Sequence, residues 1–388
     1  MSLTLNSEAT QLRISGIREF SNQLVDYPNA LNLTIGQPDF PTPEAVKQAG
    51  IRAIEENKTS YSPNAGLLEL RQVTAAYFNE RYNCNYNANE VLVTNGATQA
   101  IDAVLRTIIE PGDEIILSAP MYAGYVPMIE YAKAKPVFLD ITETNFEPEV
   151  DALKALITPK TKAILFNFPS NPTGATVSPE RMDALAAFLA EQDIYLISDE
   201  IYSEITFEGE YRSFGSYPAL KDKLFLISGL SKSHSMTGWR IGFILAPEAL
   251  TDITVKVNAF NILCAAVPSQ YAAIEALTGS KDAPIAMTAS YKERRDYIYG
   301  RLVEMGLEVH KPNGAFYIFP SIKQFGMSSH EFATRLLKEA GVCVVPGAVF
   351  AAEGYLRITY AYAFETLVEA MDRLAAFVEK VRAEQASH

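Results

Sequence analysis

The sequence predicts an α/β fold in two parts: a large domain with a mostly parallel sheet sandwiched by helices, and a smaller α+β domain at the C-terminus. Two observations favour this fold. Short apolar runs rich in β-branched residues recur through the middle of the chain, as in strands that are covered on both faces. Helical patterns separate several of these runs, and strands that alternate with helices indicate a parallel sheet.

Seven apolar runs predict the strands of the large sheet. They lie at residues 90–94, 114–118, 136–141, 163–168, 194–198, 224–228 and 241–246. Ser178 and Pro179 predict the start of a helix, with Ser178 as the N-cap and Pro179 at the first helical position. Met182, Leu185 and Leu189 then repeat at helical spacing, so this helix is expected to pack on the sheet.

The pattern of elements changes near Met287. The elements expected beyond it are a long helix at 288–306, strands at 308–312 and 315–319, a helix at 330–341, strands at 343–347 and 355–361, and a final amphipathic helix with Leu367, Met371, Leu374 and Val378. We therefore expect three segments: a helix and arm over residues 1–33 that pack on the small domain, a large domain over 34–286, and a small domain over 287–388.

The charge and the rare residue types exclude several classes of function. Lys and Arg number 33 and Asp and Glu 46, and the resulting net charge of −13 opposes binding to nucleic acids and to anionic membranes. Cys84, Cys264 and Cys343 lie far apart without CxxC spacing, and the 4 histidines show no paired spacing, so we expect neither disulfides nor a metal site. No run approaches the roughly 20 apolar residues of a membrane span, and we expect a cytoplasmic protein.

Polar residues follow the ends of several predicted strands, which is where open parallel sheets bind ligands. Residues 95–100 are small and lead into a helical pattern, which fits a phosphate-binding turn and equally a plain strand-to-helix turn. Asn171 follows the run at 163–168. Asp199 follows the run at 194–198, where burial requires a nearby cation unless the residue caps a helix; Glu200 beside it is expected to be structural.

Residues 229–240 place a lysine, an arginine and the only tryptophan of the chain after the strand at 224–228. Surface lysines are common, but Lys232 lies at the end of a buried strand. One lysine, one strand-end aspartate, one arginine, a hydroxyl-rich loop and an aromatic residue make the set that a pyridoxal phosphate enzyme needs. A serine nucleophile is not expected, because GxSxG is absent and Ser231 directly precedes Lys232 instead of standing three residues before it.

Four segments carry a family resemblance. Residues 167–174 (NFPSNPTG), 198–202 (SDEIY), 231–242 (SKSHSMTGWRIG) and 355–361 (YLRITYA) resemble the signature segments of the class I pyridoxal phosphate aminotransferases, the aspartate aminotransferase superfamily. The resemblance covers essentially the whole chain and implies the fold-type I architecture of that superfamily. Within it, residues 31–40, 61–66 and 229–240 most resemble the bacillary aminotransferase A group, which implies N-acetyl-L,L-diaminopimelate as amino donor.

The resemblance implies a role for each matching residue around the cofactor ring. Lys232 would form the Schiff base with pyridoxal 5′-phosphate and then move the proton at the substrate α-carbon. Asp199 would keep the pyridine nitrogen protonated, so that the ring withdraws electrons. Asn171 and Tyr202 would hydrogen-bond the cofactor phenolate, and Tyr122 would stack on the ring, although an aromatic residue after Pro120 also fits simple packing.

The resemblance also implies how the two ends of the site bind anions. The residues implied for the cofactor phosphate are Arg240, Ala97, Thr98, Ser231 and, from the neighbouring subunit of a homodimer with shared active sites, Tyr61. Arg357 would grip the substrate α-carboxylate through a two-pronged contact, with Gly36 and Asn171 adjoining it.

Two departures from the family pattern concern the loops. Many relatives have serine where this chain has Gly229, which leaves the phosphate hydroxyl open between Ser228 and Ser231. Residues 346–354 are shorter than in many relatives, which affects the expected lid over the substrate.

The resemblance implies a ping-pong transfer between an L-amino acid and a 2-oxo acid such as 2-oxoglutarate, and the exact donor stays open. Twenty tyrosines and 20 phenylalanines fit an aromatic donor, and the sequence assigns no second arginine to a distal carboxylate. A pyridoxal phosphate lyase on the same fold is one alternative. A non-catalytic ligand-sensing module of the kind fused to transcription regulators is another, which the negative charge disfavours.

Overall fold

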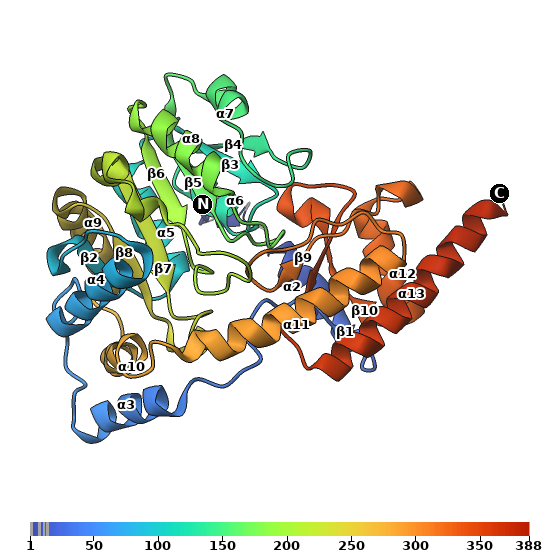
Figure 1. Cartoon of the computed structure of the whole chain (residues 1–388). Helices are drawn as coiled ribbons and strands as arrows, with labels where there is room; N and C mark the ends of the chain where they lie inside the picture. The colour runs from blue at the N-terminus through green and yellow to red at the C-terminus, as the bar shows by residue number, and fades with distance from the viewer. Residues whose placement is uncertain (1–2, 7–8, 11, 13–14, 388) are drawn as a thin grey trace.

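The structure is a computed structural model that describes residues 3–6, 9–10, 12 and 15–387. Its largest element is a seven-stranded sheet with the order β2-β8-β7-β6-β5-β3-β4 (Figure 1). The strands are β2 (Val91–Thr94), β3 (Glu114–Ala119), β4 (Lys135–Asp140), β5 (Thr161–Asn167), β6 (Tyr195–Asp199), β7 (Leu224–Gly229) and β8 (Gly242–Leu245). Only β8 runs antiparallel to its neighbours, so the prediction of a mostly parallel sheet is confirmed, and each predicted run forms one strand.

Both faces of this sheet are covered, because successive side chains of a strand point to opposite faces. In β3, Ile116 belongs to one core, whereas Ile115 and Leu117 belong to the other. The helices that contribute to the first core include α4 (Leu68–Tyr82), α8 (Pro179–Ala190) and α10 (Val267–Leu277). Those that contribute to the second are α5 (Ala97–Ile108) and α6 (Tyr125–Tyr131), with α9 (Glu248–Ile262) packed against it. Two-sided burial therefore explains why the strands read as continuous apolar runs.

The C-terminal part forms a third core around a small antiparallel sheet of order β11-β12-β9. Its elements are α11 (Ala283–Glu304), β9 (Tyr317–Ile318), α12 (Ser329–Ala340), β10 (Val342–Cys343), β11 (Val345–Pro346), β12 (Leu356–Thr359) and α13 (Phe364–Ala386). Helix α11 runs from beside the large sheet to this part, as Figure 1 shows. The N-terminal segment joins the same core, since β1 (Leu31–Asn32) pairs with β10 and Phe20 is buried in it. The domain boundaries themselves remain a prediction.

The prediction of a strand at 308–312 is wrong. This segment forms no ladder of backbone hydrogen bonds with a neighbouring strand and is instead held by contacts with side chains. The carbonyl of Pro312 accepts a hydrogen bond from the Arg295 guanidinium, and Lys311 pairs with Asp296 at 3.1 Å. The segment at 315–319 forms a strand only over Tyr317–Ile318.

Helix α8 begins at Pro179 as predicted, with Ser178 in the N-cap position, but the serine side chain does not cap the helix. Its hydroxyl donates to Glu147 Oε2 at 2.7 Å, and its backbone N–H donates to the same oxygen at 2.9 Å. Ser178 therefore fastens the start of α8 to the connection that precedes α7 (Val150–Leu156).

The parallel register brings the ends of three neighbouring strands to one edge of the sheet. Asn167 at the end of β5 lies opposite Asp199 at the end of β6, and Asp199 lies opposite Ile227 of β7. Among the residues that the structure describes, no helix is long and apolar enough to cross a bilayer.

Gly242 of β8 provides a test of how closely α5 approaches the sheet. A Cβ atom at Gly242 would lie 2.4 Å from the carbonyl carbon of Gly96 and 2.6 Å from the backbone nitrogen of Ala97, and backbone atoms cannot move aside as a side chain can. We expect Gly242→Ala to lower the free energy of unfolding by roughly 1–3 kcal/mol. Urea unfolding followed by circular dichroism measures this change.

The matched control is Gly300, which lies inside α11. Apart from the backbone of α11 itself, no described atom lies within 4 Å of the position that a Cβ would take there. Gly300→Ala should raise the free energy of unfolding by about 0.5–1 kcal/mol, since alanine favours the helix. Equal effects of the same sign at both positions would contradict the close approach at Gly242.

Candidate active site

A cavity of about 380 Å³ lies at the edge of the sheet where β5 and β6 end. The structure brings together in its wall almost all the residues that the sequence predicted for the site: Lys232, Asp199, Tyr202, Asn171, Tyr122, Ala97, Thr98, Ser231, Arg240, Gly36 and Arg357. Tyr61 is the exception. Its side chain is 83 % exposed on the surface of the single chain and does not line this cavity.

Asp199 is a buried carboxylate at the end of β6, only 5 % exposed. Tyr125 donates to its Oδ2 at 2.6 Å, and the backbone N–H of Ile201 donates to its Oδ1 at 3.2 Å. Burial outweighs these hydrogen bonds and raises the pKa of Asp199 to about 6. Among the described residues no lysine or arginine forms an ion pair with this carboxylate, so a cation inside the cavity would stabilise its charged form.

Lys232 reaches the cavity from the loop after β7. Its Nζ donates to the carbonyl oxygen of Gly36 at 2.7 Å. Burial is the largest cause that lowers the pKa of Lys232, to about 8, and the positive charges of Arg357 and Arg240 lower it further. The negative charge of Asp199 raises this pKa and so opposes part of the shift. A substantial fraction of this amine is therefore neutral near physiological pH, as a nucleophile or base requires.

Arg357 lies on β12 and is 1 % exposed. Its Nη1 donates to Asn171 Oδ1 at 2.8 Å, and its Nη2 donates to the carbonyl of Thr34. The guanidinium also lies 4.7 Å from the ring centre of Tyr317 and 4.8 Å from that of Phe350. Nε has no partner, and no described carboxylate pairs with the group. Such a buried cation fits an anion supplied by a ligand.

Asn171 and Tyr202 are held by neighbours that fix their orientation. The backbone N–H of Asn171 donates to Asn167 Oδ1 at 3.0 Å, and its own Oδ1 is engaged by Arg357, which leaves its Nδ2 as the free donor. The hydroxyl of Tyr202 lies 2.7 Å from that of Tyr317. Both side chains therefore present defined polar atoms to the cavity.

The start of helix α5 forms the anion-binding end of the cavity. Ala97 and Thr98 occupy its first turn, whose N–H groups have no acceptor within the helix and carry the positive end of its dipole. Arg240 Nη1 donates to Thr237 O at 3.0 Å and Nη2 to Asn95 O at 3.3 Å, beside Gly96, where a Cβ would lie 2.4 Å from Nη2. These groups converge as a phosphate site would require.

The structure separates the two serines that the sequence left open. Ser231 lines the cavity. Ser228 instead faces a small space on the other side of β7, among Tyr77, Phe78 and Leu277. The segment 346–354 forms a short 3-10 helix, Gly347–Phe350, whose Phe350 packs under Arg357.

Glu200 does not line the cavity: it is fully buried, accepts hydrogen bonds from Ser198 and the N–H of Phe214, and burial raises its pKa to about 7.

Half of the residues that line the cavity were not predicted from the sequence, and those with polar side chains of consequence include Arg18, Tyr125, Asn167 and Tyr317. Asn167 stood inside a recognised segment without a role, although its place opposite Asp199 follows from the strand ends alone. Tyr125 and Tyr317 act through hydrogen bonds to Asp199 and Tyr202, contacts across 74 and 115 residues that no local pattern reveals.

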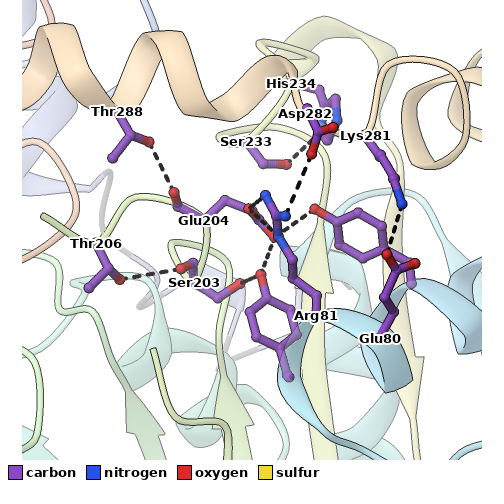
Figure 2. A network of polar contacts seen from close by, with 12 residues as sticks. Glu80, Arg81, Ser203, Glu204, Thr206, Ser233, His234, Lys281, Asp282 and Thr288 are labelled. Atoms are coloured by element: carbon purple, nitrogen blue, oxygen red, sulfur yellow. Dashed lines mark hydrogen bonds and ion pairs between the residues drawn. The ribbon is translucent and has the colours of Figure 1, made fainter. Parts of the chain in front are cut away.

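A polar network supports the loop behind the cavity (Figure 2). The Glu204 carboxylate accepts hydrogen bonds from Tyr77 at 2.6 Å and from Tyr82, and pairs with Arg81 at 3.1 Å, all three on α4. Its backbone carbonyl accepts from Thr288 of α11 at 3.0 Å. The loop that follows Tyr202 is therefore clamped between two helices that belong to different cores.

His234 belongs to the same region and stands two residues after Lys232. Its Nε2–H donates to Ser280 O at 3.2 Å, and its Nδ1 accepts from Ser233 at 2.9 Å. Burial lowers the pKa of His234 to about 4, so the ring is neutral at physiological pH. Its two hydrogen bonds stabilise the loop that carries Lys232.

The residues present fit pyridoxal phosphate. The buried carboxylate of Asp199 lacks a cation, which a protonated ring nitrogen supplies, and Lys232 offers an amine of lowered pKa. The helix start and Arg240 offer donors for a phosphate. The ring nitrogen of the cofactor would pair with the carboxylate, its aldehyde would react with the amine, and its phosphate would accept from the donors.

Comparison with known proteins agrees with this chemistry. Residues 28–374 match the family of class I and II aminotransferases. A probable N-acetyl-LL-diaminopimelate aminotransferase of Bacillus subtilis is 49 % identical over 97 % of this chain and 96 % of its own. An aromatic-amino-acid aminotransferase of Thermococcus litoralis is 38 % identical over 96 % and 97 %. The solved structure of aspartate aminotransferase from Thermus thermophilus with maleate superposes with a TM-score of 0.93 at 34 % identity, covering 97 % of this chain and 100 % of that one.

The lowered pKa of Lys232 predicts the pH dependence of cofactor uptake. Only the neutral amine bonds the cofactor, so the uptake rate of apoenzyme should rise with pH and level off above about pH 8, well below the ordinary lysine value of 10.5. Stopped-flow absorbance measures this rate. A rate that keeps rising to pH 10 would contradict the lowered pKa, and borohydride reduction followed by mass spectrometry should place the label on Lys232 and on no other lysine.

Proposed function

Because the chain belongs to the class I and II aminotransferases, which depend on pyridoxal phosphate, we propose that it moves the amino group of an L-amino acid to 2-oxoglutarate in two half-reactions at this one cavity. The observation that carries the proposal is a pair of uncompensated charges. Within the described part of the chain, Asp199 is a buried acid that forms no ion pair with a lysine or arginine, and Arg357 is a buried cation that forms no ion pair with a carboxylate; both act on the pKa of Lys232. This arrangement fits a cationic ring and an anionic substrate in the same cavity.

In the proposed mechanism the cofactor supplies an electron-withdrawing ring for the substrate α-carbon. Lys232 Nζ would hold the cofactor between turnovers and would then carry the proton of the substrate α-carbon, for which a pKa of about 8 is suited. Asp199, which is held in place by Tyr125, would pair with the protonated ring nitrogen. Once a cation lies beside Asp199, its pKa falls and the ion pair stays charged at neutral pH.

Substrate and cofactor oxygens are proposed to meet fixed donors. Arg357 binds the α-carboxylate, with its Asn171 contact setting the direction of the guanidinium. Asn171, Tyr202 and Tyr122 line the cavity; Asn171 Nδ2 and the Tyr202 hydroxyl would donate to the ring oxygen, and Tyr122 would stack on the ring. Gly36 would adjoin the carboxylate, and a side chain at this position would overlap the Tyr317 hydroxyl. Ser231, Arg240, Ala97 and Thr98 hold the phosphate.

We propose N-acetyl-L,L-diaminopimelate as the amino donor, in lysine biosynthesis, on the likeness to the Bacillus subtilis relative. An aromatic donor is the second candidate, on the likeness to the Thermococcus litoralis relative.

We also propose that the enzyme is a cytoplasmic homodimer whose active sites are shared. Tyr61 is exposed, and the loop that carries it is fastened to the α9–α10 connection, where Asn64 donates to Leu263 O at 2.9 Å. Phe260 of α9 is 96 % exposed and Leu68 of α4 is 52 % exposed. These apolar side chains favour a covered surface, across which Tyr61 would reach the partner's phosphate site.

A panel of amino donors tests the proposed function. With 2-oxoglutarate as acceptor, N-acetyl-L,L-diaminopimelate should give the largest kcat/KM, ahead of aspartate, phenylalanine and alanine, and glutamate should form in equal amount to the 2-oxo product. Coupled assays for glutamate measure this transfer. Release of ammonia or pyruvate without an added 2-oxo acid would indicate a lyase instead.

Arg357→Lys tests whether the buried guanidinium binds the α-carboxylate. The lysine keeps the charge but loses the planar pair of donors, so kcat/KM should fall for every amino acid and 2-oxo acid by a similar factor, equivalent to about 2–5 kcal/mol. The cofactor absorbance should stay unchanged. The matched control is Arg106→Lys on the surface of α5, where the pair with Asp102 is exposed and no effect is expected. A loss confined to one donor would mean that Arg357 reads a side chain.

A further inference from the structure

A buried carboxylate that the proposed function does not use lies behind the cavity. Glu204 stands two residues after Tyr202, and its side chain is only 8 % exposed. It does not line the cavity that Tyr202 enters. Instead it meets three side chains of α4, those of Tyr77, Arg81 and Tyr82 (Figure 2). Burying a charge is costly, so the position of this carboxylate calls for a function.

Donors from α4 engage both oxygens of the carboxylate. The hydroxyls of Tyr77 and Tyr82 donate to Oε1, the first at 2.6 Å. Arg81 Nη2 donates to Oε2 at 3.1 Å, and Arg81 Nε lies 3.3 Å from each oxygen. Burial, followed by the charge of Glu204, raises the pKa of both tyrosines, so both hydroxyls keep their protons and donate. The carboxylate is therefore held in one orientation.

The same contacts fix the turn that carries Tyr202. The hydroxyl of Tyr82 also lies 2.9 Å from Ser203 Oγ, and the N–H of Ile205 donates to the carbonyl of Tyr202 at 2.8 Å. Ser203 and Glu204 line the small space beside α4, whereas the Tyr202 side chain enters the cavity. A shift of Glu204 would therefore move the backbone from which Tyr202 projects.

Arg81 connects this turn with the loop of Lys232. Arg81 Nη1 lies 3.6 Å from Asp282 Oδ1, in the connection that leads into α11. The carbonyl of Ser280 in the same connection accepts from His234 Nε2 at 3.2 Å, and His234 stands two residues after Lys232. Both segments that bring polar groups to the cofactor position thus rest on one network of contacts (Figure 2).

We propose that Glu204 is a positioning residue that, through its contacts with α4, holds the Tyr202 hydroxyl at the ring oxygen of pyridoxal phosphate. The inference rests on the proposed function, in which Tyr202 donates to that oxygen. A hydrogen bond weakens steeply as its length and angle depart from the optimum, so a small shift of the turn has a large effect.

The effect can be measured on the Schiff base between Lys232 and the cofactor. The ring oxygen attracts the proton of this Schiff base, and a hydrogen bond donated to the same oxygen weakens that attraction. A well-placed Tyr202 therefore lowers the pKa of the Schiff base, and a displaced Tyr202 raises it.

Glu204→Gln tests the proposal in a pH titration of the cofactor absorbance. One amide oxygen still accepts from the tyrosines, but the amide nitrogen then faces the donors of Arg81. The pKa of the Schiff base should rise by about 0.5–1 pH unit. Direct loss of a negative charge would act in the opposite direction and lower this pKa. An unchanged or lowered pKa would overturn the proposal.

Glu80→Gln is the matched control on the same helix. Glu80 pairs with Lys281 of the same connection at 2.8 Å, but its side chain is 69 % exposed. This variant should leave the pKa of the Schiff base unchanged. A rise equal to that of Glu204→Gln would mean that any loosening of α4 suffices, and the assignment to Glu204 would fail.

A double variant shows whether Glu204 acts through Tyr202. Tyr202→Phe removes the donor itself, so adding Glu204→Gln to it should change the pKa of the Schiff base by no more than about 0.2 pH unit. A full further rise in the double variant would overturn the proposal, because Glu204 would then act without Tyr202.

Tyr82→Phe provides a second test that keeps the carboxylate and its pair with Arg81. It removes the hydroxyl that contacts both Ser203 and Glu204, and should raise the pKa of the Schiff base by a smaller amount in the same direction. Should Glu204→Gln fail to fold, this variant decides: lower stability toward urea with an unchanged pKa would mean that the network is only structural.

The absorbance titration requires no turnover, which separates this inference from the proposed function. If the wild-type enzyme binds the cofactor but transfers no amino group, the proposed function fails whatever the titration shows. If the wild-type enzyme transfers amino groups and Glu204→Gln titrates like the wild type, only the positioning role fails.

Discussion

Two opposite charges are buried at the edge of the large sheet, and neither neutralises the other. Asp199 is held by Tyr125 and by a backbone N–H, and Arg357 is held by Asn171 and a backbone carbonyl. Each group keeps its place through neutral partners, and burial shifts both pKa values toward the uncharged forms. The free-energy cost of burying these charges is offset when ligands of opposite charge bind.

The rest of the fold keeps these two charges at a fixed separation. Asp199 belongs to the parallel sheet, whereas Arg357 belongs to the small antiparallel sheet of the C-terminal part. Helix α11 extends between these parts and holds the loop after Tyr202 through Thr288 and Glu204 (Figure 2). The hydrogen bond between Asn171 and Arg357 joins the two parts inside the cavity itself.

Close backbone packing positions the anion-binding end. The start of α5 lies against Gly242 and Gly96 lies against Arg240, so that neither glycine has room for a side chain. The N–H groups of the first helical turn are thereby held next to the arginine, and both contribute positive potential to the same space. Helix α2 (Gly16–Asn22) contributes Ile17, Arg18 and Ser21 to the cavity wall, and its Gly16 packs closely against Val349, so a segment near the start of the described chain is part of this wall.

The sequence by itself determined the α/β class, the seven strands of the large sheet and half of the residues that line the cavity. It did so because two-sided burial leaves continuous apolar runs and because parallel strands bring their carboxyl ends, and the polar residues that follow them, to one edge. Lys232 and Asp199 could be recognised on this basis, and the segments that resemble the aminotransferase family extended the assignment to Arg357. Tertiary structure alone decided the contacts that depend on residues distant in the chain. The Tyr125–Asp199 and Tyr202–Tyr317 hydrogen bonds, the choice between Ser228 and Ser231, and the entry of Arg18 into the cavity follow from how the helices and the two sheets pack, and packing of distant elements leaves no periodic signal in the sequence.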